Sequence, residues 1–497
     1  MKRYLYLWHR WLGIVACLFM ALWFISGAVM LYVGYPKLTP AEHLAHLPPL
    51  VLDQEGASLG RVLAAADSGQ APTSLRLLTV AGTPRYVLEY PRVRKLAVDA
   101  RSARPMPPTD WPQALAAARQ FAPGMAASER GVVEQDTWSL SRALDGDRPL
   151  HRVAVADVED RLLYVSASTG EVVRDATANE RAWNWVGAWL HWLYALRGIG
   201  IDDAWGPIVT YLSLGATLMA VLGLAVGLLR WRFSRTYRNG SRSPYQGFAR
   251  WHHLGGLLFG VLAITWIFSG LMSMNPWKVF SSTRPLSLAA YQGAALEAAA
   301  FPLDARQVLE RFAGDGLRAR ELEWRMIAGQ GYVIGYDGAG RTRILDMAAD
   351  RVLPRFEPRT LQQAAQAISP GQPMQVEQLQ AYDFYYYARE PQSMLGHLQQ
   401  RLPVLRVRFD DPARTWLHLD LYTGAVVGQL DQPRRASRWL FALLHSWDWL
   451  PLLGKRPLWD LWMLLFSAGG LLISVSGVVL GWRRLGRALR PRRPRER

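Results

Sequence analysis

Four stretches of the chain contain more than 20 consecutive residues without a charged side chain, at residues 11–33, 206–229, 254–274 and 461–482. A helix needs about 20 apolar residues to cross the hydrocarbon core of a bilayer. The hydropathy pattern therefore predicts four transmembrane helices. The first stretch is too long for a signal-peptide core and has no clear small-residue cleavage site, so we expect it to be retained as an anchor.

Between these stretches the pattern changes to short strands and helices. Strand-like residues 161–165 and 415–419 are each followed by a Thr-Gly turn and a second strand, as in a β-hairpin. Segments 85–90 and 331–336 also resemble each other as strands, and the alanine-rich segments 59–66 and 305–312 have helical spacing. The expected fold class is an α-helical membrane protein plus α+β, with a four-transmembrane-helix bundle and two large outer domains.

Charge sets the expected topology. Seventeen Lys and Arg residues but one acid lie before the first helix, between the second and third, and after the fourth, and they carry nearly all of the net charge of +17. Loops rich in Lys and Arg stay in the cytoplasm. We therefore expect both termini in the cytoplasm and the outer domains in the periplasm of a bacterial inner membrane. The charge serves topology, so we expect no nucleic-acid partner.

The expected organisation follows the chain in eight segments. They are the cytoplasmic N-terminus and first helix (1–33), the first periplasmic domain (34–181), an interfacial helix with the second transmembrane helix (182–230), a basic loop (231–250), the third helix (251–274), the second periplasmic domain (275–438), an interfacial helix with the fourth helix (439–482) and a basic tail (483–497).

Histidines near the apolar stretches repeat in matched positions. His9 lies 17 residues before Ser26, as His252 does before Ser269. His191 precedes Trp205 by 14 residues, as His445 precedes Trp459. The spacing indicates a tandem duplication, and repeats in the same orientation are related by an axis along the membrane normal. Equivalent histidines can then face each other across that axis.

Paired imidazoles near a membrane favour heme ligation, because an ionisable side chain there is costly without a partner and neutral imidazole is a good axial ligand. We expect His9 with His252 to hold one heme near the cytoplasmic surface and His191 with His445 to hold a second near the periplasmic surface. The lone cysteine, Cys17, excludes a Cys-x-x-Cys-His attachment site, so both would be b-type. Alternatively, each histidine is an interfacial or hydrogen-bonded structural residue.

The neighbours of these histidines leave further choices open. His253 adjoins His252, and either is a candidate ligand, although the repeat favours His252. Arg10, Arg250 and His253 are candidates to neutralise heme propionates. Glu42, His43 and His46 have a spacing that suits a metal ion, but the nearby prolines favour a solvated loop. We expect His151, His397 and His418 to have structural roles. We also expect the tyrosine-rich segment 382–387 to pack in the core of the outer domain. The alternative is that this segment and Arg389 bind an iron chelate.

Longer motifs resemble a known family. His9-Arg10-Trp11-Leu12-Gly13 opens a helix that ends in Ser-Gly, residues 169–173 read Thr-Gly-Glu-Val-Val, and residues 402–412 read Leu-Pro-Val-Leu-Arg-Val-Arg-Phe-Asp-Asp-Pro. This order resembles the PepSY-associated transmembrane family over nearly the whole chain. The resemblance implies PepSY-like outer domains and, for some members, a di-heme inner-membrane reductase that releases iron from ferric siderophores in the periplasm.

The sequence also limits the electron source. The expected cytoplasmic segments contain no dinucleotide-binding fingerprint, so we expect electrons to come from a membrane quinol or a cytoplasmic reductase. No Ser-His-Asp or His-Glu-x-x-His pattern indicates hydrolysis. Two other functions stay open: a heme-free scaffold that binds a periplasmic partner or restrains a protease, and an accessory subunit of a metal uptake system.

Overall fold

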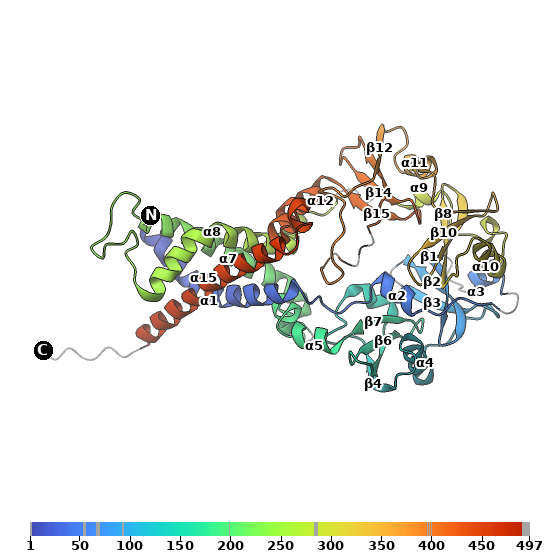
Figure 1. Cartoon of the computed structure of the whole chain (residues 1–497), viewed down its shortest axis with the longest axis horizontal. Coiled ribbons are helices and arrows are strands. Elements are labelled where there is room, and N and C mark those ends of the chain that lie inside the picture. The colour runs from blue at the N-terminus through green and yellow to red at the C-terminus, as the bar shows by residue number, and fades with distance from the viewer. Residues whose placement is uncertain are drawn as a thin grey trace.

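A helical bundle forms one end of the molecule, and β-sheets with short helices form the other (Figure 1). The computed structural model describes residues 2–52, 56–65, 70–91, 94–197, 199–282, 287–394, 396, 398 and 400–489. We call the end of the bundle that meets the sheets the domain end, and the opposite end the free end. The predicted roles of His397 and of the tail beyond residue 489 lie outside the described residues.

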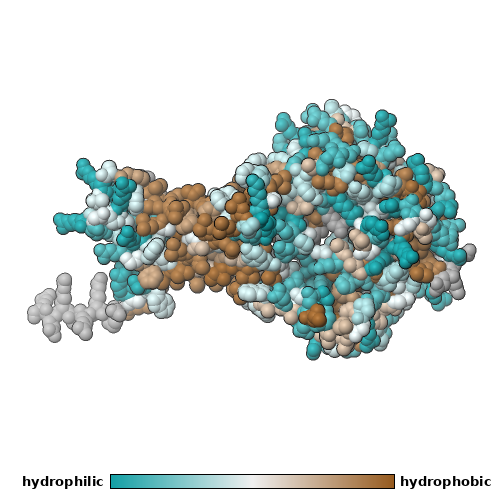
Figure 2. Space-filling model, in the orientation of Figure 1, coloured by the Kyte–Doolittle hydropathy of each residue, from teal (hydrophilic) through white to brown (hydrophobic). Residues whose placement is uncertain are grey.

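The bundle consists of four long helices that satisfy the length and hydropathy of a membrane span. They are α1 (Lys2–Met30), α7 (Asp202–Arg230), α8 (Gly247–Ser273) and α15 (Leu458–Ala488). Each packs against two neighbours, α1 and α8 both lying between α7 and α15. Apolar residues cover the outside of the bundle in a band, with hydrophilic residues at its free end and over the sheets (Figure 2). The chain is therefore a multi-pass membrane protein.

The helices extend beyond the uncharged stretches that predicted them. Helix α1 begins at Lys2 rather than near Trp11, and α8 begins at Gly247 rather than at residue 251. Polar residues at a membrane surface continue a helix without entering the hydrocarbon, so hydropathy alone marks only its central part. As a result, His9 and His252 lie inside helices, one to two turns from their first residues.

The extramembrane part contains three antiparallel sheets. The largest has the strand order β11-β10-β9-β8-β1-β2-β3. Its strands are β1 (Ser74–Val80), β2 (Thr83–Tyr90), β3 (Arg94–Asp99), β8 (Glu321–Ile327), β9 (Gln330–Tyr336), β10 (Thr342–Asp346) and β11 (Arg351–Leu353). The other two sheets comprise β4 (Ala127–Val133), β5 (Leu150–Val155), β6 (Leu162–Ser166) and β7 (Val172–Ala176), and β12 (Met374–Leu379), β13 (Val404–Phe409), β14 (Trp416–Asp420) and β15 (Val426–Leu430).

The two outer segments share one sheet, although the sequence suggested separate domains. Strand β1 of the first segment pairs with β8 of the second, with Leu75 opposite Trp324 and Leu77 opposite Leu322. The core beneath this junction takes residues from both segments, including Tyr86 and Phe312. Both predicted hairpins form, and Gly170 and Gly424 occupy their turns with φ of 75° and 70°, a conformation that glycine adopts without steric cost.

Short helices complete the fold. The α-helices are α2 (Pro40–His46), α3 (Leu59–Ala65), α4 (Trp111–Phe121), α5 (Ala178–Asn184), α6 (Ala188–His191), α9 (Ala289–Gln292), α10 (Ala305–Gly314), α11 (Pro358–Gln366), α12 (Gln432–Ser437), α13 (Leu444–Ser446) and α14 (Leu450–Leu453). Single turns of 3₁₀ or π-helix lie at Arg142–Asp147, Tyr194–Leu196, Pro276–Lys278, Ala298–Ala300 and Arg438–Leu443. The helices α6 and α13 carry His191 and His445 to the domain end of the bundle.

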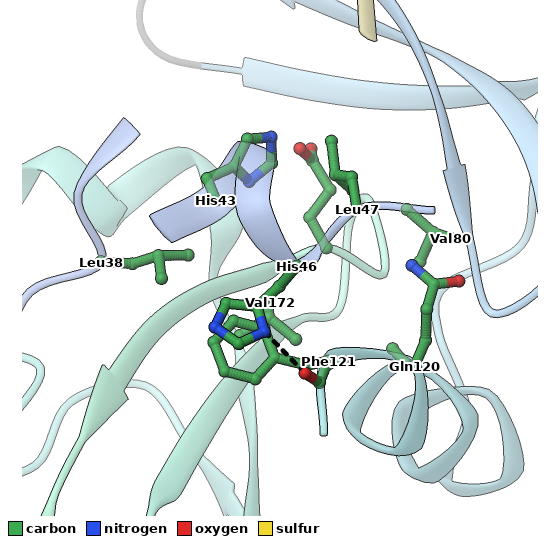
Figure 3. A pocket seen from close by; sticks show the side chains of 10 residues that line it. Leu38, His43, His46, Leu47, Val80, Gln120, Phe121 and Val172 are labelled. Atoms are coloured by element: carbon green, nitrogen blue, oxygen red, sulfur yellow. Dashed lines mark hydrogen bonds between the residues drawn. The ribbon is translucent and has the colours of Figure 1, made fainter. Parts of the chain in front are cut away.

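The segment around His43 is a helix, so the expectation of a solvated loop was wrong. Thr39 and Glu42 form a capping box that starts α2, with Pro40 in its first turn. His43 Nε2 lies 2.9 Å from Glu321 of the second segment, and His46 stacks on Phe121 and donates to its carbonyl (Figure 3). Neither histidine belongs to a group of three metal-ligating side chains within the described residues.

Candidate functional site

The four repeated histidines form two pairs at opposite ends of the bundle. The ring centres of His9 and His252 are 6.1 Å apart at the free end, and those of His191 and His445 are 6.0 Å apart at the domain end. Helices α1 and α8 carry the first pair, whereas short helices before α7 and α15 carry the second. We call these the free-end pair and the domain-end pair.

Backbone carbonyls hold the rings of the free-end pair. His9 Nδ1 lies 3.1 Å from the carbonyl oxygen of Met219, and His252 Nδ1 lies 3.0 Å from that of Ile473. A carbonyl can only accept, so both Nδ1 atoms carry the proton. Ser476 Oγ lies 3.2 Å from the same nitrogen of His252. Each Nε2 therefore keeps a lone pair that is available to a metal.

Serines hold the rings of the domain-end pair. Ser26 Oγ is 3.0 Å from His191 Nδ1, and Ser269 Oγ is 3.0 Å from His445 Nδ1. Both serines donate their own hydroxyl proton to a backbone carbonyl, so they accept from the imidazoles. All four histidines thus have the same tautomer, with Nδ1 engaged and no hydrogen bond at Nε2 from any described residue. Metal-binding histidines typically have such a partner on the second nitrogen.

Glycines make room for the rings. A Cβ atom on Gly223 would lie 2.5 Å from Cε1 of His9, and one on Gly477 would lie 3.3 Å from Cε1 of His252. The equivalent distances are 3.5 Å from Gly27 to His191 and 3.7 Å from Gly270 to His445. Histidine placement therefore accounts for these glycines, in addition to helix packing.

A cavity of about 460 Å³ opens beside the free-end pair. This volume lies in the range of small-molecule and cofactor sites. All four membrane helices line the cavity. Its lining includes methionines, alanines and three arginines, Arg10, Arg484 and Arg487.

Arg250 and His253, two of the candidates to neutralise heme propionates, do not offer a free donor to the cavity. Arg250 does not line the cavity. His253 lines it, but both ring nitrogens are engaged, Nδ1 with Ser243 Oγ at 2.7 Å and Nε2 with the Gly227 carbonyl at 2.9 Å. His253 therefore ties the loop between α7 and α8 to the end of α7. Arg484 and Arg487 line the cavity together with Arg10, and the sequence offered no signal for these two residues beyond their charge.

The domain-end pair has a different surrounding. Three buried indole N–H groups near His445, those of Trp266, Trp447 and Trp462, have no hydrogen-bond partner among the described residues. The three side chains pack on one small cluster around Trp459. Buried donors without an acceptor are rare and call for an explanation. Together they offer a set of donors to a buried anion.

Each domain-end histidine precedes a left-handed residue. Leu193 follows His191 by two positions with φ of 52°, and Trp447 follows His445 in the same way with φ of 49°. Large side chains rarely adopt this conformation, which is typical of functional sites where the surroundings enforce it. The same strained turn in both repeats orients both histidines.

The remaining sequence candidates have structural contacts. His151 Nε2 donates to the Thr109 carbonyl, and His418 stacks on Tyr386 and accepts from Arg406. Of the tyrosines in segment 382–387, Tyr386 and Tyr387 are buried and Tyr382 is 40% exposed. Core packing therefore accounts for much of this segment, whereas Tyr385 accepts a hydrogen bond from the exposed Trp439.

Comparison with known proteins addresses the family. A search of curated proteins finds no match to the chain. The family described as PepSY-associated TM region matches residues 6–307, which include three membrane helices and the first outer segment. The match covers more than half of the chain and agrees with the duplicated helix pairs described above, and the protein therefore belongs to the PepSY-associated transmembrane family.

Proposed function

We propose that this protein is a b-type di-heme membrane oxidoreductase that passes electrons along its bundle to ferric iron in a siderophore. The observation that carries the proposal is the pair of equivalent histidine sites, in which every Nδ1 is engaged and every Nε2 is available. Each site has two ligating side chains, and no described group offers three. A bare metal ion would need more protein ligands, whereas a heme brings four of its own.

The spacing of the rings fits ligation from both sides. A bond from a metal to an imidazole nitrogen is about 2 Å long, so two imidazoles whose ring centres are about 6 Å apart could both bind one metal centre. The two pairs have centres 6.1 Å and 6.0 Å apart. A heme held in this way supplies one-electron chemistry. The protein supplies the ligands, their orientation and a dry apolar surrounding.

Charged and polar groups beside each pair suit the carboxylates of a heme. At the free end, Arg10, Arg484 and Arg487 line the cavity. At the domain end, the unpartnered indoles of Trp266, Trp447 and Trp462 are the available donors. Hydrogen bonds from donors to carboxylates stabilise buried anions. Arginines at the free end and indole N–H groups at the domain end would thus both serve to stabilise heme carboxylates.

The two proposed heme sites lie near opposite ends of the membrane helices. His9 and Gly27, which contacts His191, lie on the same helix, and a rise of 1.5 Å per residue places the sites about 27 Å apart. The interior between them is apolar and includes Cys17, Met20 and Phe24. Cys17 and Met20 also line the cavity beside the free-end pair, so the apolar packing between the two sites begins at the inner end of that cavity.

We assign the free end to the cytoplasm of a bacterial inner membrane and the sheets to the periplasm. The arginines at the free end support this orientation, because positive loops remain cytoplasmic. Electrons would enter there from a quinol or a cytoplasmic reductase and leave at the domain end to a ferric siderophore. Reduction weakens the hold of hard oxygen ligands on iron, which releases it for uptake.

The test is reoxidation of the reduced protein by a ferric chelate. The purified full chain is reduced with limiting dithionite under argon and mixed with a ferric hydroxamate in the presence of a ferrous-specific chelator. We expect the reduced heme bands to disappear with one ferrous ion formed per electron lost. Bands that persist would contradict the acceptor. A protein without heme would contradict the oxidoreductase and favour a heme-free scaffold.

A further inference from the structure

A buried carboxylate connects the turn after His445 to the second outer segment. Asp448 lies three residues after His445 and is 2% exposed. Tyr387 donates its hydroxyl to Asp448 Oδ2 at 2.8 Å, and the guanidinium of Arg389 forms an ion pair with Oδ1. Tyr387 and Arg389 belong to the segment after β12, in the second outer segment. Both carboxylate oxygens are therefore held from outside the membrane bundle.

Other contacts fix the same turn. Arg438 donates to the carbonyl oxygens of Phe384 and Asp448, which ties the start of the turn to the outer segment. From the other side, the indole of Trp459 in α15 donates to the Ser446 carbonyl at 3.1 Å. The residues that follow His445 thus lie between a membrane helix and an outer segment, with Trp447 in the left-handed conformation.

The first repeat holds its histidine differently. Trp205 donates to the Trp192 carbonyl, which matches the contact of Trp459 with Ser446. The position equivalent to Asp448 is Tyr194, whose ring packs against Trp192 and Trp205. The Tyr194 ring also packs edge-on against Tyr35 of the first outer segment, so this turn contacts its outer segment through aromatic rings. Among the described residues, the buried ion pair to an outer segment at this position occurs in the second repeat, whereas the first repeat has an aromatic contact there.

We infer that Asp448 is a positioning residue that couples the second outer segment to the orientation of the His445 ring. A buried carboxylate without its cation is costly, so the turn and the segment at 387–389 must move together. A ligand that displaces this segment would therefore change the orientation of the His445 imidazole, and with it the strength of the bond that this imidazole would form to a heme iron. The inference rests on the proposed function, because it assigns a heme to the domain-end pair.

The experiment compares Asp448→Asn with wild type in the full-length protein. Asparagine keeps the size of the side chain but removes the charge that pairs with Arg389. Loss of a direct partner of a metal ligand weakens binding by about 10-fold or more, and Asp448 acts on His445 through the turn, so we expect up to about 10-fold weaker retention of one heme, with a shifted midpoint potential and altered low-spin electron paramagnetic resonance of that heme only. The free-end heme should keep its spectrum and potential.

Three further variants separate positioning from general damage. Arg389→Lys should behave like wild type, and Arg389→Ala should reproduce Asp448→Asn. Asp147→Asn is the matched control, because Asp147 is also buried and is paired with Lys95, but in the first outer segment. It should leave both hemes unchanged. Two hemes with wild-type potentials and spectra in Asp448→Asn would overturn the inference.

A second readout distinguishes failure of the inference from failure of the proposed function. Wild-type protein without heme would contradict the proposed function. Hydrogen–deuterium exchange of residues 440–448 then tests the coupling alone. Faster exchange in Asp448→Asn than in wild type and Asp147→Asn supports it, and equal exchange overturns it.

Discussion

The two repeats hold their histidines through equivalent contacts inside the membrane, but the turns after the domain-end histidines make different contacts outside it. Each has a histidine whose Nδ1 donates to a backbone carbonyl, at Met219 and Ile473. Each also has a histidine bonded to a serine, at Ser26 and Ser269. Outside the membrane, within the part of the chain that the structure describes, the turn after the domain-end histidine forms an ion pair with an outer segment in the second repeat, at Asp448.

Under the proposed function, this contrast would separate the contacts that hold the hemes from the contacts that the outer segments make with the bundle. The contacts that set the tautomer of each histidine occur in both repeats, as the proposed heme sites, with one imidazole from each repeat, would require. The outer segments have no such requirement, so their contacts with the bundle have diverged. The seam between them, where β1 pairs with β8, joins equivalent strands of the two repeats.

The largest expected effect concerns the ion cluster at this seam. Arg76 lies 3.0 Å from Glu171 and 3.1 Å from Glu321, and His43 also contacts Glu321. Burial raises the pKa of Glu321, but Arg76 and His43 overcome this and lower it to about 2. A lowered carboxyl pKa stabilises the fold above the unfolded value of 4.5, and that stability is lost as pH falls from 4.5 towards 2.

We therefore expect wild type to lose about 3 kcal/mol of unfolding free energy over that pH range. Glu321→Gln should be less stable at pH 7 and should show a flatter pH dependence. Thermal unfolding followed by circular dichroism at a series of pH values from 7 down to about 2 measures both the stability at pH 7 and the loss across the titration range of Glu321. Glu377→Gln, which removes a surface ion pair with Arg408, is the control and should keep the wild-type slope. Equal slopes for Glu321→Gln and wild type would show that the seam is not ionically held.

The next effect tests whether the free-end pair depends on both repeats. In Gly223→Ala the added methyl group meets the His9 ring at 2.5 Å, so the ring or the helix must move. Overpacking of this kind costs about 2 kcal/mol. We expect loss of most of one heme per chain by the pyridine hemochrome assay. Gly270→Ala, at 3.7 Å from His445, should keep both hemes, and the reverse pattern would contradict the placement of His9.

A smaller effect tests the equivalence of the serines. Ser26→Ala and Ser269→Ala each remove the acceptor of one domain-end Nδ1–H. Loss of such a partner weakens metal binding by about 10-fold, and the two variants should agree within a factor of about two. The rate of heme transfer to an excess of an apo-globin measures this. Ser476→Ala should transfer heme more slowly than either, because the Ile473 carbonyl still holds His252.

The smallest effect concerns charge at the free end. Arg487 lines the cavity, whereas Arg250 does not. Removal of a positive charge favours the oxidised iron, so Arg487→Gln should lower the midpoint potential of one heme. An exposed pair contributes up to about 1 kcal/mol, which corresponds to about 40 mV for one electron. Redox titration with Arg250→Gln as control measures the shift, and equal shifts would contradict a specific role of Arg487.

The sequence predicted the four helices, the hairpins and the matched histidines, because hydropathy, turn residues and spacing are local signals. It missed the shared sheet, since the pairing of Leu75 with Trp324 joins positions far apart in the chain. The sequence left open whether His252 or His253 is the candidate ligand. The structure distinguishes them, because both ring nitrogens of His253 are engaged by Ser243 and Gly227. Asp448 carries no sequence motif, because its role depends on a tertiary contact.

The most direct measurement is the heme content of purified protein from heme-replete cells, by pyridine hemochrome, for wild type and two double variants. His9→Ala with His252→Ala removes the free-end pair, and His191→Ala with His445→Ala removes the domain-end pair. The account predicts two hemes per chain in wild type and one in each double variant, with His253→Ala as a control that keeps both. A colourless wild-type protein, or double variants that keep two hemes, would contradict it.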